Sequence, residues 1–186
     1  MTICKASIAF DFKSHKFLLL SRNVCYIPCM NLEIERKFLV KDDSWKNNAG
    51  EGVLYKQAYL ISNPDRSVRI RRTGDGAFIT IKGPTTTGGS KLEYEYEIPV
   101  SDTDVLFTLC QDGSIEKTRY EVLVGDHTWE IDVFGGLNEG LVVAEIELTS
   151  VDEKFEIPEW VGEDVTEDRR YINSKLIENP FTTWNN

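Results

Sequence analysis

Apolar and polar residues alternate with a period of two along most of this chain, a pattern typical of β-strands with one buried face. The alternation predicts eight strands, over residues 32–40, 53–61, 67–72, 77–83, 91–99, 115–124, 127–134 and 141–149. Turn-forming runs such as TGDG at 73–76 and VGDH at 124–127 separate neighbouring strands. Because short turns connect antiparallel neighbours, most of these strands should pair as hairpins.

Three segments break the alternation and predict short helices. They are residues 42–48, with Asp42 and Asp43 as N-cap candidates, residues 102–110, and residues 163–178, with Thr166 as an N-cap candidate. The sequence shows no internal repeat, and residues 180–186 are predicted to form a loose tail. These observations predict a mainly β fold of the α+β kind, with a few helices flanking one sheet.

Charged residues on the predicted strands are sorted by sign. The acidic groups are Glu33 and Glu35, Glu93 and Glu95, and Glu145 and Glu147, and the basic groups are Arg69 and Arg71, and Lys117 and Arg119. On any single strand, a charged face is most simply explained as the solvent-exposed face of the sheet. A surface selected for solubility alone would mix the signs, so clusters of one sign indicate separate ligands. Carboxylates suit Mg²⁺ or Mn²⁺, and arginine and lysine suit phosphate oxygens.

An eight-stranded antiparallel sheet can close into a β-barrel. If the charged faces point inward, the barrel becomes a tunnel that binds a polyanion together with a metal ion. The apolar faces then pack outward against the flanking helices, and Tyr94 and Tyr96 are expected beneath one of them.

The segment EIERKFLV at 33–40 resembles the ExExK motif of the CYTH superfamily, the triphosphate tunnel metalloenzymes. The resemblance continues in family order through RSVRIRR, TIKGP, KLEYEYEIP, EKTRY, EIDVFGG, VVAEIEL and EDVTEDRRYIN, over residues 31–178. It is greatest for the small bacterial members, several of which are inorganic tripolyphosphatases. The family fold is an eight-stranded antiparallel β-barrel with a charged lumen, in agreement with the alternation.

The resemblance implies one or two Mg²⁺ or Mn²⁺ ions as cofactors. The implied metal ligands are Glu33, Glu35, Asp132, Glu145 and Glu147, while Glu93 and Glu95 would serve a second metal ion or the nucleophilic water. The implied phosphate-binding residues are Lys37, Arg69, Arg71, Lys82, Lys117, Arg119, Arg169 and Arg170, the last two in a terminal segment that can plug one tunnel mouth. Tyr59 matches a tyrosine near the motif lysine, and it is counted with Lys37 among the catalytic residues. Glu97 and Glu130 are interpreted as solvated strand residues and are left out of the site.

The resemblance favours metal-dependent hydrolysis of tripolyphosphate, with nucleoside triphosphates as further candidate substrates. Three alternatives stay open. A class IV adenylate cyclase would convert ATP to cyclic AMP with the same metal chemistry, and a thiamine triphosphatase would need an aromatic site for the thiamine rings. A polyphosphate-binding module without catalysis is the third, although paired acids repel a polyanion unless a metal ion is present.

The amino-acid composition limits the kinds of binding partner and the cellular location that we expect. The chain has 31 acidic and 21 basic residues among 186, a net charge of -10, which argues against nucleic acid as the main partner. No apolar run approaches the length of a membrane span. With a single cysteine, Cys110, after residue 30, a disulfide framework is not expected and a cytoplasmic location is favoured. The protein is expected as a monomer or a homodimer.

The first thirty residues differ in composition from the rest. They hold four basic residues against one acid, and three of the four cysteines. We interpret residues 1–30 as an upstream extension before a natural start at Met30, residues 31–178 as the CYTH barrel domain, and residues 179–186 as a tail. A signal peptide fits poorly because FLLL is short for its apolar region. A zinc site from His15 and these cysteines matches no standard ligand spacing.

Overall fold

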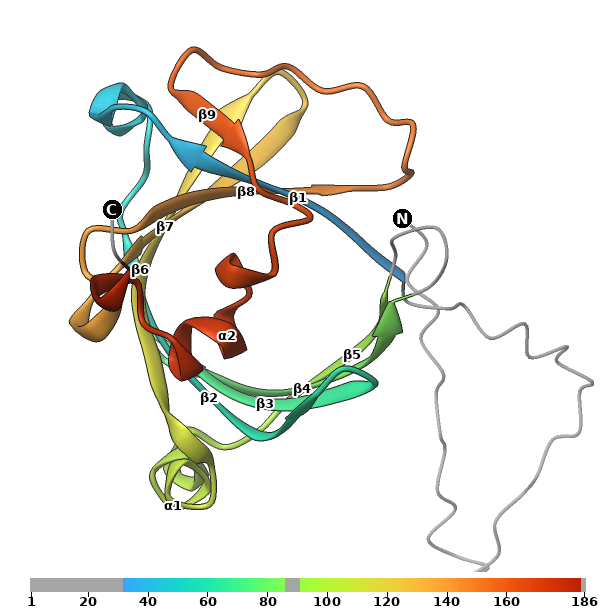
Figure 1. Ribbon diagram of the computed structural model, residues 1–186, viewed down its shortest axis with the longest axis vertical. Helices are drawn as coiled ribbons and strands as arrows, with labels where there is room; N and C mark the ends of the chain where they lie inside the picture. The colour runs from blue at the N-terminus through green and yellow to red at the C-terminus, as the bar shows by residue number, and fades with distance from the viewer. Residues whose placement is uncertain (1–31, 86–90, 185–186) are drawn as a thin grey trace, which may run out of the picture.

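Eight antiparallel strands form a closed ring in the structure, a computed structural model that describes residues 32–85 and 91–184 (Figure 1). The strands are β1 (Leu32–Val40), β2 (Val53–Asn63), β3 (Arg66–Thr73), β4 (Gly76–Thr85), β5 (Lys91–Glu97), β6 (Gln111–Val124), β7 (His127–Phe134) and β8 (Val142–Leu148). Their order is β5-β4-β3-β2-β6-β7-β8-β1, and β1 returns to β5 through the pairs Leu32–Leu92 and Glu33–Lys91. The predicted eight-stranded barrel is confirmed. The interpretation of residues 1–30 lies outside the described residues.

A ninth strand, β9 (Val161–Asp164), was not predicted. It pairs with the far end of β1 at Phe38 and Val40. The helix expected over 163–178 is therefore wrong in its first half, because Asp164 and Val165 bond to β1 instead of starting a helix. Only α2 (Asn173–Glu178) is α-helical there, after the single 3-10 turn Arg169–Tyr171. Tertiary pairing with an open strand edge outweighs the local helix signal.

The apolar outer faces of β1, β6, β7 and β8 form the main core. Phe38, Trp129 and Ile146 are buried there beneath Trp45, from the 3-10 helix Asp43–Asn47, and Trp160, which precedes β9. The Trp129 and Trp160 rings meet edge to face at 5.5 Å, an arrangement that aromatic pairs favour. The alternation therefore buries its apolar side outside the ring, as predicted.

The outer faces of β3, β4 and β5 are covered by fewer residues than those of the main core. Helix α1 (Thr103–Thr108) packs on β3, and Ile70 and Ala77 are buried on the outer sheet face. Tyr94 and Tyr96 on β5 are 36% and 55% exposed, so the expectation that they lie under a helix is wrong. Helix α1 packs on β3, two strands away from β5, and so leaves the outer face of β5 open to solvent.

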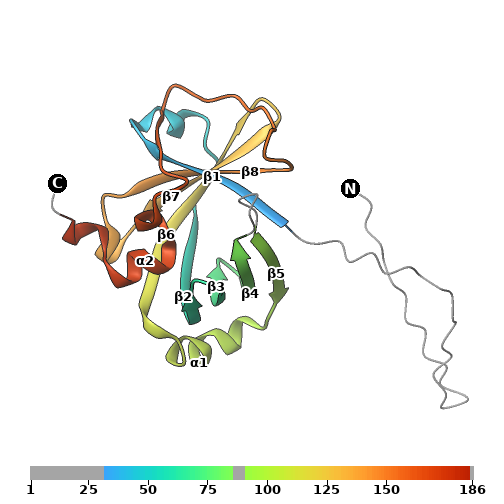
Figure 2. The same cartoon turned by 45° about the vertical axis from the view of Figure 1, so that its right-hand side comes forward.

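The C-terminal segment enters the ring. Figure 1 shows α2 within the circle of strands, and in the turned view of Figure 2 it lies beside β6. Tyr171 and Leu176 pack against Ile115, Phe134 and Val143, which lie on the inner strand faces, each two positions from a charged inner residue of β6, β7 or β8. This apolar contact seals part of the inner face.

The residues after α2 are also packed, which corrects the expectation of a loose tail for residues 181–184. The amide of Phe181 donates to Asn138 Oδ1 at 2.8 Å, and the Trp184 ring meets that of Tyr171 at 5.2 Å. Within the part of the chain that the structure describes, no helix has the length and apolar character needed to cross a membrane.

Candidate active site

The sorted charges of the sequence meet on the inner face of the ring. Ion pairs join strands that are two positions apart, such as Lys82 on β4 with Glu33 on β1 at 2.6 Å, and Arg71 on β3 with Glu95 on β5 at 2.7 Å. Neighbouring strands are about 4.8 Å apart, so side chains cross an intervening strand most easily on the concave side, where they converge. The inward orientation of the charged faces is confirmed by these contacts.

A buried ion network lies between β6, β7, β8 and β1. Asp132 is 0% exposed and accepts from Arg119 Nε and Nη2 at 2.7 and 2.6 Å, as well as from the ammonium of Lys117. Glu145 lies 2.6 Å from Lys37 Nζ and 2.7 Å from Arg119 Nη2. Burial alone would raise the pKa of Glu145, but Lys37, Lys117 and Arg119 hold it well below its usual value. Both acids, expected as metal ligands, are therefore engaged by cations in this structure.

The pKa values of the two lysines in this network are shifted by burial and by the neighbouring acids. Burial disfavours the ammonium of Lys37, yet Glu145 and Glu35 outweigh that effect and raise its pKa. For Lys117, which is 3% exposed, burial dominates over Asp132 and lowers the pKa. Removing any one partner would leave an uncompensated charge in a region with little water.

A second network joins β3, β4 and β5. Arg71 Nη2 lies 2.7 Å from both carboxylate oxygens of Glu95, and Thr80 donates to the same carboxylate at 2.7 Å. The buried Nε atoms of Arg69 and Arg71 have no hydrogen-bond partner among the described residues. A buried donor without a partner is costly, so both guanidinium groups retain donors for an anion.

Three carboxylates at the β1–β8 pairing form an acidic cluster, which we define as Glu33, Glu35 and Glu147. Glu35 and Glu147 are directly opposite in the register, and like charges in that position repel. Burial and the negative charges of Glu33 and Glu35 raise the pKa of Glu147, which forms no ion pair with any described residue. Burial also raises the pKa of Glu33, with Glu93 adding to the effect and Lys82 opposing it.

The acidic cluster fits a hard divalent cation in its chemistry. It supplies carboxylate oxygens and an excess of negative charge that a cation would neutralise, which is the ligand set that Mg²⁺ and Mn²⁺ prefer. As they stand, no three Asp, Glu, His or Cys side chains of residues 32–85 and 91–184 converge closely enough to hold a metal ion. Of the three acids, Glu147 is the one whose side chain is exposed.

Several inner residues escaped the sequence analysis. The Tyr55 ring lies between two arginines, with its centroid 5.6 Å from Arg71 Cζ and 5.3 Å from Arg119 Cζ. Glu130, interpreted as solvated, pairs with Arg119 at the edge of the buried network, and its side chain is 39% exposed. Its spacing of two from Asp132 was the available signal. Tyr59 is buried, but the structure gives it no hydrogen bond to Lys37.

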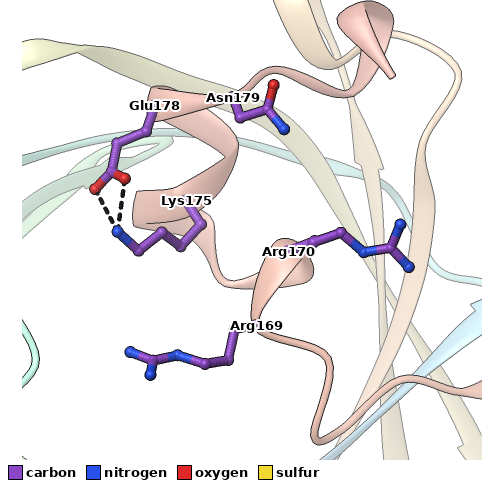
Figure 3. Close-up of a pocket in the computed structure, with 5 residues that line it drawn as sticks. All are labelled: Arg169, Arg170, Lys175, Glu178 and Asn179. Carbon is purple, nitrogen blue, oxygen red and sulfur yellow. Dashed lines mark hydrogen bonds and ion pairs between the residues drawn. The ribbon is translucent and has the colours of Figure 1, made fainter. Parts of the chain in front are cut away.

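The two arginines of the C-terminal segment have different surroundings (Figure 3). Arg170 pairs with Asp168 at 2.6 Å and lies 5.1 Å from the Trp184 ring centroid. Arg169 forms no ion pair or hydrogen bond with a described residue, and its side chain extends to the same side as that of Lys175 and away from Arg170. Of the two, Arg169 is the one whose whole guanidinium group has no protein partner among the described residues.

The comparisons with known proteins agree with this architecture. The chain is 50% identical over 153 residues to an inorganic triphosphatase of Acetivibrio thermocellus, a match that covers 82% of this chain and 97% of that protein. An inorganic triphosphatase of Nitrosomonas europaea is 38% identical over 148 residues, covering 77% and 95%. A crystal structure of an inorganic triphosphatase is similar with a TM-score of 0.57 at 37% identity, over 78% of this chain and 93% of that one. The family model of the CYTH domain matches residues 31–176, and the chain therefore belongs to the CYTH domain family.

Proposed function

We propose that this protein is a metal-dependent inorganic triphosphatase that hydrolyses tripolyphosphate at the inner face of its ring. The observation that carries the proposal is the separation of charge on that face. Arg69 and Arg71 on β3 keep buried donors without a partner among the described residues. The acidic cluster lies on β1 and β8, and its three carboxylates include Glu147, which forms no ion pair with any described residue. The high identity to two inorganic triphosphatases supports the same substrate class.

The basic residues would bind and orient the phosphates. Arg69 and Arg71 offer planar groups that can engage two phosphate oxygens at once, and Lys82 offers a point charge beside Glu33. An anion that enters would compete with Glu95 for Arg71. Lys37 would remain charged at neutral pH because its pKa is raised, so its role is electrostatic and it does not act as a base.

The acidic cluster would hold Mg²⁺ or Mn²⁺. When bound, such an ion neutralises charge on the phosphate oxygens and lowers the pKa of a water molecule. Without the ion, Glu33, Glu35 and Glu147 would repel the substrate, so binding and turnover should both depend on the metal. Asp132 and Glu145 would instead keep Lys37, Lys117 and Arg119 in place.

The test is product analysis with the full chain. Tripolyphosphate, ATP and thiamine triphosphate are each incubated with Mg²⁺ or Mn²⁺, and the products are separated. We expect orthophosphate and diphosphate from tripolyphosphate at a higher rate than from the other two. Cyclic AMP from ATP would assign the protein to the cyclase alternative, and preference for thiamine triphosphate would assign it to the third activity.

Two variants make the test specific. Glu35→Gln removes one charge from the acidic cluster and should lower turnover by at least about a hundredfold, since it removes a metal ligand. Glu116→Gln makes the same chemical change on the outer face, where Glu116 pairs with Lys56 at the surface, and should leave turnover unchanged. Metal-independent binding of tripolyphosphate without turnover would support the binding module and refute the proposal.

A further inference from the structure

The backbone of Lys37 lies at an interruption in the strand ladder. On this side β1 pairs with β5 through residues 32 and 33 and with β9 from Phe38 onward, so Lys37 falls between the two partners. Its carbonyl accepts from the amide of Val165 at 2.9 Å, and its own amide donates to Thr166 Oγ1 at 3.0 Å. Residues 165 and 166 thus satisfy two backbone groups that no strand reaches.

The hydroxyl of Thr166 uses its full hydrogen-bonding capacity. It accepts from the Lys37 amide and from Arg36 Nε at 3.4 Å, and it donates to Asp164 Oδ1. A hydroxyl has one donor and two acceptor positions, so no other type of side chain of this size can replace it except serine.

The partners of Thr166 are held on the outer face. The guanidinium of Arg36 pairs with Asp164 and lies 5.5 Å from the Phe38 ring centroid and 5.8 Å from that of Phe155. Burial works against the charge of Asp164, but hydrogen bonds from Thr166 and Arg36 outweigh it and lower the pKa. Arg36 and Asp164 therefore anchor the hydroxyl on a packed surface.

On the inner face, the side chain of the same Lys37 reaches Glu145 at 2.6 Å and Glu35 at 3.2 Å. Contacts this short are sensitive to a shift of the backbone by a fraction of an ångström. We propose that Thr166 is a positioning residue for Lys37: its hydroxyl fixes the amide of Lys37 at the gap in the ladder and so sets where the ammonium meets the substrate. The positioning role of Thr166 rests on the proposed function in one respect, because it assumes that Lys37 contacts the triphosphate.

The test compares three variants of the full chain. Thr166→Val keeps the shape and removes the hydroxyl, Thr166→Ser keeps the hydroxyl, and Thr182→Val is the matched control. Thr182 also lies in the C-terminal segment, and its hydroxyl donates to the Leu137 carbonyl at 2.7 Å, remote from Lys37. The first readout is exchange of the Lys37 amide hydrogen followed by nuclear magnetic resonance. Thr166→Val should accelerate it about fivefold, the factor that corresponds to one neutral hydrogen bond. In Thr166→Ser and Thr182→Val, the exchange rate of the Lys37 amide hydrogen should stay within about twofold of the wild-type rate.

The second readout is the affinity for tripolyphosphate in the presence of Mg²⁺ on ice, measured by calorimetry in the wild type and in a Lys37→Met background. Thr166→Val should weaken binding about fivefold in the wild type and by less than about twofold when Lys37 is absent, because it acts through that residue. Equal losses in both backgrounds would mean a general structural role and would overturn the proposal.

The amide readout needs no substrate, so the two proposals can fail separately. Unchanged exchange of Lys37 in Thr166→Val would refute the positioning role even if tripolyphosphate is hydrolysed. Faster exchange without any effect of Lys37→Met on tripolyphosphate binding would refute the contact between Lys37 and substrate, and with it the functional part of the inference.

Discussion

Lys37 Nζ lies 2.6 Å from the carboxylate of Glu145, which is 6% exposed. The two residues are directly opposite on β1 and β8. Both backbone groups of Lys37 point to the C-terminal segment, so this is a non-hydrogen-bonded pair, the type in which facing side chains are closest. Glu145 also engages Arg119, and it is therefore the acid on which the inner cations converge.

Replacement of Glu145 tests this central position. Glu145→Gln would leave Lys37 and Arg119 without their shared anion and should lower the free energy of unfolding by about 3 kcal/mol, the typical loss when one partner of a buried pair is removed. Urea unfolding at neutral pH measures the effect. A change below about 1 kcal/mol would contradict the assignment of Glu145 as a structural anion and would favour its original interpretation as a metal ligand.

Glu147, two residues further along the same strand face, should behave in the opposite way. Glu147→Gln removes a charge that is repelled by Glu33 and Glu35, so without metal the free energy of unfolding should stay the same or rise slightly. The stabilisation that Mn²⁺ gives to the wild type should be lost in the variant, because a ligand is missing. Urea unfolding in EDTA and in Mn²⁺ separates the two effects, and an undiminished Mn²⁺ effect would place the metal elsewhere.

Much of the fold could be predicted because the strand period determines which face each residue occupies. All eight ring strands were found, and the inner positions of Arg71 and Asp132 follow directly from the alternation. The strand β9 could not be found in this way. It has four residues and forms only because β1 leaves an open edge at Phe38, a tertiary feature that no local pattern contains.

The roles within the site were harder to predict than its position. Glu145 and Glu147 share a strand face and a residue type, so the sequence gives no reason to separate them. The structure separates them by their neighbours: Glu145 meets three cations and its pKa is lowered, whereas Glu147 meets two acids and its pKa is raised. Such differences arise from long-range register, which one sequence does not specify.

The acidic cluster predicts how stability depends on pH. Burial, with neighbouring acids, raises the pKa of Glu33 and Glu147 above the ordinary value of 4.5, so the folded state binds protons more tightly than the unfolded chain. In the window between 4.5 and the raised values, the free energy of unfolding contributed by these groups therefore falls as pH rises. Metal binding requires the carboxylate form, so the stabilisation by Mn²⁺ should grow over the same window.

Thermal unfolding in EDTA and in Mn²⁺, at several pH values from 4.5 upward, measures both trends. Glu147→Gln is the control. It should make the midpoint of thermal unfolding less dependent on pH and should also reduce the stabilisation by Mn²⁺. If the Mn²⁺ stabilisation is independent of pH in the wild type, the metal does not compete with protons at these carboxylates and the site assignment is wrong.

The adjacent arginines Arg169 and Arg170 allow a paired test of the C-terminal segment. Arg169 has no partner among the described residues, so Arg169→Ala should leave thermal stability unchanged and raise the KM for tripolyphosphate about fivefold, the loss expected for one charge-assisted contact. Arg170 is engaged by Asp168 and stacks on Trp184, so Arg170→Ala should lower the midpoint of thermal unfolding and loosen residues 181–184. Steady-state kinetics measure the first effect. Thermal unfolding and difference spectra of tryptophan fluorescence between the wild type and Arg170→Ala measure the second. A higher KM for Arg170→Ala with an unchanged midpoint would reverse the assignment, because the substrate would then be engaged by the arginine that the structure shows paired.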